Sequence, residues 1–114
     1  MATVERGDVV LLNFNEIPAE TMTKTRPVLI VQNNAGNRAS PYTIIAAIHH
    51  ETRKLLPINV SVSAGNGGLT KDSVIDLGHL YTVPITKLGV ALGKLGFQHM
   101  VLVDRALKIS LALR

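Results

Sequence analysis

The sequence contains no cysteine and very few aromatic residues. Without cysteine, the chain can form no disulfide framework, no thiol nucleophile and no thiolate metal site, which excludes several classes of enzyme. Two phenylalanines, two tyrosines and no tryptophan leave little material for a surface that stacks nucleic-acid bases. Any chemistry must therefore come from arginine, histidine, hydroxyl and carboxylate side chains.

Long apolar segments are also missing. The longest uninterrupted apolar stretches, such as residues 44–48, are far too short to span a bilayer. The first residues carry charges where a signal peptide needs an apolar core, so we expect a cytoplasmic protein without membrane association. A length of 114 residues, of which 46% are hydrophobic, predicts one domain spanning residues 1–114.

Basic residues outnumber acidic ones. Twelve lysines and arginines against eight aspartates and glutamates give a net charge of +4. This excess favours an encounter with a polyanion such as RNA or DNA. The charges are scattered along the chain, however, so charge alone leaves nucleic-acid binding and an ordinary basic surface equally open.

Most of the apolar residues occur in short runs that predict β-strands. These runs are rich in β-branched residues, are bounded by turn residues, and cover residues 7–14, 26–31, 42–48, 56–62, 73–76, 77–82 and 90–95. We expect a kink at Gly78, a loop over residues 15–25 and a turn cluster over residues 33–41. The pattern predicts an all-β core.

The C-terminal segment has a different pattern. Residues 98–113 contain neither glycine nor proline, and their apolar residues recur at helical spacing, which predicts a helix. Its apolar face is broader than one packing contact needs. Two interpretations remain open: a helix wedged between the core and another subunit, or a helix docked on its own sheet.

One arginine and one histidine form a candidate catalytic pair. If runs 26–31 and 42–48 pair antiparallel, the start of one and the end of the other share an edge, which brings Arg26 towards His49. Cleavage of RNA through its own 2′-hydroxyl needs a cation at the phosphate and a group that moves protons. Arg26 can hold two phosphate oxygens, and His49 can exchange protons near neutrality. Alternatively, Arg26 forms a surface ion pair with Glu20 or Asp8, and His49 is a half-hydrated strand end.

Metal and nucleotide sites are not expected. The glycine-rich residues 65–68 lack the Lys-Ser/Thr ending of a phosphate-binding loop, and the chain has no zinc signature. His49, His50, His79 and Asp76 include the residue types that bind metals. Adjacent strand residues point to opposite faces, so at most one of the two neighbouring histidines can join a single site. We expect neither a metal nor a cofactor.

A set of short motifs follows one another along the chain at distinctive spacing. They are Arg6-Gly-Asp-Val9, Arg26-Pro-Val-Leu-Ile-Val-Gln-Asn33, Gly36-Asn-Arg38, Ser40-Pro41, Asp72-Ser-Val74, Gly93-Lys-Leu95, Met100, Val103-Asp-Arg-Ala-Leu107 and Ser110-Leu111. Their order and spacing resemble those of the MazF/PemK toxins of type II toxin–antitoxin systems. The resemblance runs from Arg6 almost to the C-terminus.

This resemblance implies a fold, an activity and partners. The fold would be mainly β, a half-open SH3-like barrel of the CcdB/MazF/PemK toxin type with a C-terminal α-helix. The activity would be that of a metal-independent endoribonuclease, which cleaves single-stranded mRNA at short sequences and so inhibits translation. The partners would be a second copy of the chain in a homodimer and a MazE-like antitoxin whose acidic C-terminal segment lies across the RNA groove.

The resemblance also assigns residues. Arg26 occupies the family's catalytic arginine position, while His49 stands at the other catalytic position, where the family usually has Ser or Thr. Residues 78–82 replace a Glu-Gln-Ile-Arg-Thr stretch of the family, and only the last residue agrees, so the cleavage sequence cannot be carried over. The expected RNA-binding residues are Glu20, Thr23, Lys24, His79, Tyr81 and Thr82. Tyr81 is equally suited to stacking a base and to a subunit interface.

Two other functions are compatible with this barrel. One is a barrel that binds antitoxin or RNA without cutting RNA, because His49 replaces the usual hydroxyl. The other is a CcdB-like gyrase poison. Gyrase poisons of that type act through C-terminal aromatic residues, and residues 112–114 of this chain include none.

Overall fold

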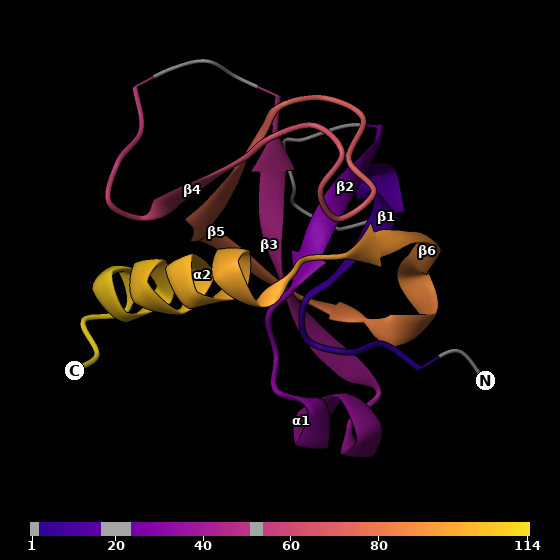
Figure 1. Ribbon diagram of the computed structural model, residues 1–114. Coiled ribbons are helices and arrows are strands. Elements are labelled where there is room, and N and C mark those ends of the chain that lie inside the picture. Colours follow the sequence, from indigo (N-terminus) through magenta and orange to yellow (C-terminus); the bar gives the residue numbers. More distant parts are fainter. Residues whose placement is uncertain (1–2, 17–23, 51–53) are drawn as a thin grey trace.

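In the computed structural model, which describes residues 3–16, 24–50 and 54–114, the chain folds into one curled antiparallel sheet and a C-terminal helix (Figure 1). The sheet order is β4-β5-β3-β2-β1-β6. The strands are β1 (Asp8–Asn13), β2 (Thr25–Ile30), β3 (Tyr42–His49), β4 (Asn59–Val62), β5 (Ser73–Pro84) and β6 (Leu88–Lys94). The helices are η1 (Phe14–Glu16), α1 (Asn34–Ala39), η2 (Ile85–Lys87) and α2 (Phe97–Ser110). The expected mainly-β fold with a C-terminal helix is confirmed.

The alternating side chains of the strands build two cores on opposite faces of the sheet. On one face, Leu29 and Ala46 pack with Val103 and Ala106 of α2. Helix α2 lies on β4 and β5, and its buried apolar side packs against these two strands (Figure 1). On the other face, the second core contains Val10, Leu12, Phe14, Val28, Ile30, Ile45 and Val83. The candidate active site lies at the end of this second face.

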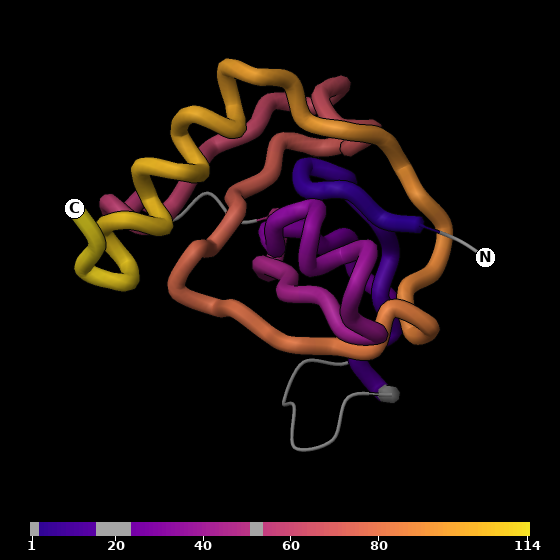
Figure 2. Tube along the Cα trace, turned by 90° about the horizontal axis from the view of Figure 1, so that it is seen from below, coloured from indigo at the N-terminus to yellow at the C-terminus, as the bar shows by residue number. Residues whose placement is uncertain are grey.

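The curled sheet leaves β4 and β6 as its two edges, so the barrel is half-open (Figure 2). The loop after β4 crosses this gap and lies against β6. At Gly68 the backbone has a φ of +76°, and a Cβ atom there would lie 2.1 Å from the carbonyl oxygen of Leu92. Only glycine permits both this conformation and this close approach. The loop therefore covers the open side of the barrel where the edge strands do not pair.

Helix α2 leaves much of its apolar surface uncovered in the single chain. Val103 and Ala106 are buried, whereas Phe97 is 83% exposed and Ile109 is 50% exposed. Packing of α2 on the chain's own sheet therefore covers only part of the broad apolar face that the sequence predicts for this helix. Among the helices in the described part of the chain, none is long and apolar enough to cross a membrane.

Several predicted elements differ from the structure. The turn cluster at residues 33–41 contains the short helix α1, because the Asn33 side chain accepts a hydrogen bond from Gly36 N (2.7 Å) and caps the first turn. The runs 73–76 and 77–82 form the single strand β5, which is irregular in register near the expected kink. The C-terminal helix ends at Ser110, before the predicted residue 113, because Ala112 adopts a positive φ of 56°.

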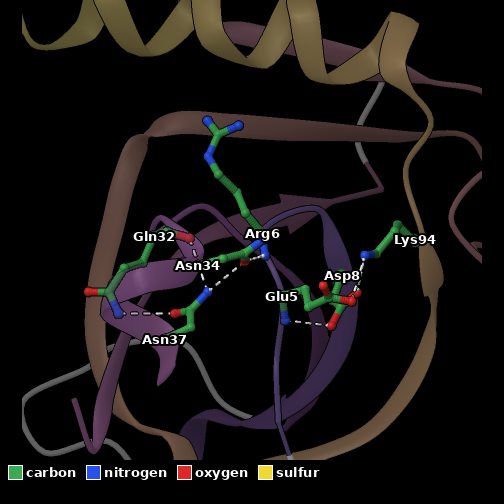
Figure 3. A network of polar contacts seen from close by, with 7 residues as sticks. All are labelled: Glu5, Arg6, Asp8, Gln32, Asn34, Asn37 and Lys94. Atoms are coloured by element: carbon green, nitrogen blue, oxygen red, sulfur yellow. Dashed lines mark hydrogen bonds and ion pairs between the residues drawn. The ribbon is translucent and has the colours of Figure 1, made fainter. Parts of the chain in front are cut away.

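A polar network explains why several of the family-like motifs are present (Figure 3). The buried Asn37 amide accepts hydrogen bonds from Gln32 (3.0 Å) and Thr43 (2.7 Å) and donates one to the Gln32 carbonyl (3.1 Å). Arg6 donates to the Val31 carbonyl (2.8 Å) and pairs with Asp104 of α2 (2.6 Å). These motif residues hold the end of β2 that is remote from Arg26. Their contacts join the N-terminal segment, α1 and α2 to this end of β2.

Candidate active site

The predicted antiparallel pairing of β2 and β3 is confirmed, and it sets the relation between the two candidate catalytic residues. Val28 pairs with Ala47, and Ile30 pairs with Ile45. Continuing this ladder by two residues towards the strand ends places Arg26 across from His49, on the same face of the sheet. Both side chains are half-buried, and the Nε2 atom of His49 is buried. A residue with a guanidinium and a residue with an imidazole thus start from the same edge and the same face of the sheet.

Two further polar side chains, both from β5, join His49. His49 pairs with Val74, so Asp76 is its diagonal neighbour on the same face. Asp76 Oδ2 lies 3.3 Å from His79 Nδ1, and the rings of His79 and His49 meet edge to face with centroids 6.0 Å apart. One ligand atom from each of His49, Asp76 and His79 lies within 4.8 Å of the others.

An irregularity of β5 creates this cluster. Ala47 pairs with Asp76, but Ala46 pairs with Leu80, so residues 77–79 bulge out between two consecutive pairs with β3. Gly78 lies in this bulge, and its amide donates to Asp76 Oδ1 (2.9 Å). A Cβ at Gly78 would lie 2.6 Å from Ile58 Cδ1. The expected kink at Gly78 is therefore confirmed, and it is this kink that turns His79 back towards Asp76.

His50 does not belong to the cluster. It is exposed, and its Nδ1 lies 3.2 Å from Ser73 Oγ. The prediction that at most one of the two adjacent histidines can enter a single site is confirmed.

The two remaining candidates on β5 face opposite ways. Tyr81 pairs with Ile45 and lies on the same face as Asp76, and its ring packs edge-on against Phe14 with centroids 5.8 Å apart. Thr82 pairs with Ile44, so it points to the other face, and it is exposed. Strand alternation therefore places Tyr81 beside the site and Thr82 behind it.

The loop before β2 contains the other predicted RNA-binding residues. Lys24 is exposed, has a φ of 75°, and its carbonyl oxygen accepts a hydrogen bond from Phe14 N (3.1 Å). It lies two residues before Arg26, at the same end of β2. Glu20 and Thr23 lie outside the described residues.

One of the two ion pairs considered for Arg26 can be assessed in the structure. The Asp8 carboxylate contacts Lys94 Nζ (3.6 Å) and accepts a hydrogen bond from Glu5 N (2.8 Å), so it belongs to the β1–β6 edge (Figure 3). Lys94 Nζ also donates to Glu5 Oε1 (3.0 Å), and this hydrogen bond raises the pKa of Lys94. The alternative partner, Glu20, lies outside the described part of the chain.

Comparison with known proteins assigns this architecture to a family. Residues 5–111 match the family described as the PemK-like, MazF-like toxin of type II toxin–antitoxin systems. The chain belongs to this family. Endoribonuclease EndoA of Bacillus subtilis (strain 168) is 40% identical over 111 residues, which cover 96% of each chain. Endoribonuclease MazF of Staphylococcus epidermidis is 38% identical over 111 residues, which cover 96% of this chain and 92% of that protein.

Solved structures confirm the PemK/MazF fold. A mycobacterial endoribonuclease in complex with its cognate antitoxin superposes with a TM-score of 0.81 at 24% identity, covering 97% of both chains. The MazE–MazF complex of Deinococcus radiodurans (Form-II) gives a TM-score of 0.78 at 18% identity and covers both chains completely. The half-open barrel expected from the sequence motifs is therefore the fold of this PemK/MazF chain.

One member of the cluster did not appear among the site residues expected from the sequence. From the sequence, Asp76 is a candidate only for a metal site, and no such site is expected. Its signal in the sequence is a carboxylate within the apolar run Val74-Ile-Asp-Leu77, where it is 9% exposed in the folded chain. A nearly buried aspartate has to be compensated by hydrogen bonds or by positive charge. In this PemK/MazF chain, Gly78 N and His79 provide such contacts.

Proposed function

We propose that this chain is the toxin of a type II toxin–antitoxin system and an endoribonuclease that cleaves single-stranded mRNA without a metal, thereby inhibiting translation. The observation that carries the proposal is the antiparallel register of β2 and β3, which, continued by two residues beyond Val28 and Ala47, puts Arg26 across from His49. Relatives that are 40% and 38% identical over nearly the whole chain are named endoribonucleases, which supports the same activity.

The two residues suffice for transesterification of RNA. The ribose 2′-oxygen forms a bond to phosphorus as the bond from phosphorus to the 5′-oxygen breaks. His49 accepts the proton of the 2′-hydroxyl, and a water molecule donates a proton to the departing 5′-oxygen, which leaves a 2′,3′-cyclic phosphate and a 5′-hydroxyl end. Arg26 holds two oxygens of the phosphate and stabilises the negative charge that grows on them in the transition state. Neither role needs a metal ion.

The neighbouring side chains would bind the RNA around the cut. His79 and Tyr81 lie on the face of the site, and Lys24 lies at the same end of β2 as Arg26. Glu20 and Thr23, which lie outside the described residues, are proposed to bind RNA as well. Thr82 points to the other face of the sheet, so we assign it no contact at the scissile phosphate. An exposed histidine and an aromatic ring offer stacking surfaces for bases.

The proposed partners follow from the chemistry of this surface. A net charge of +4 suits both RNA and an acidic antitoxin segment that would cover the same groove. Solved relatives of the same fold are complexes with an antitoxin. We further propose a homodimer, to which the uncovered apolar face of α2 contributes, and action in the cytoplasm.

The purified protein should be incubated with a long RNA in the presence of a chelator, and the new RNA ends should then be mapped. Cuts at a short recurring sequence support the nuclease, and the same map identifies the recognition sequence. Binding of RNA without new ends would instead support the non-catalytic barrel that His49, in place of a hydroxyl, leaves open. If the RNA stays intact and the protein instead causes gyrase to accumulate on broken DNA, the result would indicate a gyrase poison.

A further inference from the structure

His49, Asp76 and His79 form a cluster whose side chains are suited to binding a metal ion. We propose that these three residues form a Zn²⁺ site, and that the ion inhibits the proposed ribonuclease by occupying His49. The inhibitory part of this inference depends on the proposed function, whereas the binding of the ion does not. The sequence predicts no metal site, because its pattern suggests a kink at Gly78 but does not show that this kink brings His79 to Asp76.

The ligand set suits zinc. Two imidazoles and one carboxylate are a common set of three protein ligands for Zn²⁺, with a water molecule in the fourth position. With metal–ligand bonds of about 2.0–2.1 Å, two ligand atoms of a tetrahedral site lie about 3.3 Å apart. Asp76 Oδ2 and His79 Nδ1 are 3.3 Å apart. All three ligand atoms lie within 4.8 Å of one another, so His49 reaches the ion by a side-chain adjustment of about 1–2 Å.

The backbone prepares the carboxylate for this role. Gly78 N donates to Asp76 Oδ1 at 2.9 Å, which orients the side chain and leaves Oδ2 directed at His79. Such hydrogen bonds to the outer atom of a ligand are typical of metal sites and raise their affinity. Asp76 pairs with Ala47 of β3 and Asn59 of β4, so its backbone is fixed on both sides. Two of the three ligands, Asp76 and His49, therefore start from the segments in which β3 and β5 are paired.

Burial and access also favour an ion. The Asp76 side chain is only 12% exposed, and among the described residues its ion-pair partner is His79, which carries a charge only when protonated. A divalent cation would neutralise the carboxylate whatever the protonation of His79. The His79 side chain is 56% exposed, so the ion can enter from solvent along this ring.

Binding of the ion would stop the cleavage. A ring nitrogen that donates its lone pair to Zn²⁺ cannot accept a proton from the 2′-hydroxyl. The ion would also draw the ring of His49 towards β5 and away from Arg26. Zinc would thus inhibit the proposed nuclease through His49, the residue at the position where the family usually has Ser or Thr.

The test of binding uses the untagged full-length chain, freed of metal by a chelator, without RNA. Co²⁺ serves as the visible probe, because a tetrahedral site gives it a characteristic absorption, and Zn²⁺ then displaces it. We expect one ion per chain. Replacing a ligand in Asp76→Asn or His79→Ala should weaken binding by at least about tenfold, as even loss of an outer hydrogen bond can do. His50→Ala and His99→Ala remove the two histidines outside the cluster and should leave binding unchanged.

The test of inhibition measures cleavage of a mapped RNA with and without added Zn²⁺. Zinc should stop cleavage by the unmodified chain, a chelator should restore it, and Asp76→Asn should cut at the same rate with and without zinc. Equal affinity in Asp76→Asn, His79→Ala and the unmodified chain would overturn the site. Half an ion per chain would overturn a site contained in one subunit. Cleavage without metal binding would contradict only the zinc site. Metal binding without any cleavage would contradict the proposed nuclease and would still support the zinc site.

Discussion

Arg26 on β2 lies across from His49 on β3, in the continuation of the ladder that pairs Val28 with Ala47. This relationship combines a permanent cation with a group that can exchange protons, on one face of a rigid sheet. Side chains that start from paired strands are held in position more firmly than side chains on loops. In the proposed mechanism, Arg26 would stabilise charge and His49 would transfer the proton.

The shape of the Arg26 side chain should matter as much as its charge. Arg26→Lys keeps the positive charge but loses the planar fork that binds two phosphate oxygens. We expect initial rates on a short RNA containing the mapped site to fall about a hundredfold, and Arg26→Ala to fall further. Arg105→Ala, on the exposed side of α2, is the matched control and should cut normally. Full activity of Arg26→Ala would exclude a catalytic role for this residue.

The role of His49 should be visible in the pH dependence of the rate. Only the neutral imidazole accepts a proton, so the rate of the unmodified chain should rise with pH as the imidazolium loses its proton. His49→Ala should lose about 10²-fold to 10⁴-fold in rate. His49→Thr restores the family's usual residue type, so it should cut faster than His49→Ala and lack the rise with pH. His99→Ala should retain both the rate and the profile. A His49→Thr profile identical to that of the unmodified chain would show that another group moves the proton.

Local patterns in the sequence were sufficient to predict the part of the site on β2 and β3. Two apolar runs joined by a turn cluster predict an antiparallel pair, and the positions of Arg26 and His49 at the run ends follow directly. The prediction of a turn cluster at residues 33–41 was wrong in detail, because Asn33 caps a short helix over residues 34–39. Asparagine favours both helix caps and turns, so a single sequence does not separate the two.

The part of the site on β5 could not be predicted in the same way. The pattern shows a glycine at position 78 and suggests a kink, but the direction of the kink depends on two neighbouring strands. Asp76 is held by β3 on one side and β4 on the other, and the bulge begins where pairing with β3 is interrupted. This long-range register decides that His79 returns to Asp76. Strand alternation, by contrast, was available in the sequence and separates Tyr81 from Thr82.

Arg6 should contribute to stability through its contact with the backbone more than through its ion pair. Its Nε donates to the carbonyl oxygen of buried Val31, and its side chain is 27% exposed, whereas the Asp104 side chain is 52% exposed. We expect Arg6→Ala to lower the free energy of unfolding by about 1–3 kcal/mol. Asp104→Asn removes only a solvent-screened pair and should cost less than about 1 kcal/mol. Urea denaturation at one fixed protein concentration measures both, with Arg105→Ala as the control. Equal losses in the two variants would assign the stabilisation to the ion pair.

The loop that covers the open side of the barrel can be tested with two glycines that share a conformation but differ in surroundings. Gly65 (φ +95°) has open space where a Cβ would be, whereas a Cβ at Gly68 (φ +76°) would lie 2.1 Å from the Leu92 carbonyl oxygen. Gly65→Ala should cost only the strain of a left-handed alanine, about 1–2 kcal/mol. Gly68→Ala has the same strain and must also push the loop away from β6, which adds about 1–3 kcal/mol. The difference between the two free energies of unfolding, from urea denaturation under identical conditions, isolates the contact between loop and strand. If the two variants lose the same stability, the loop does not lie against β6 in solution, and the barrel is open on that side.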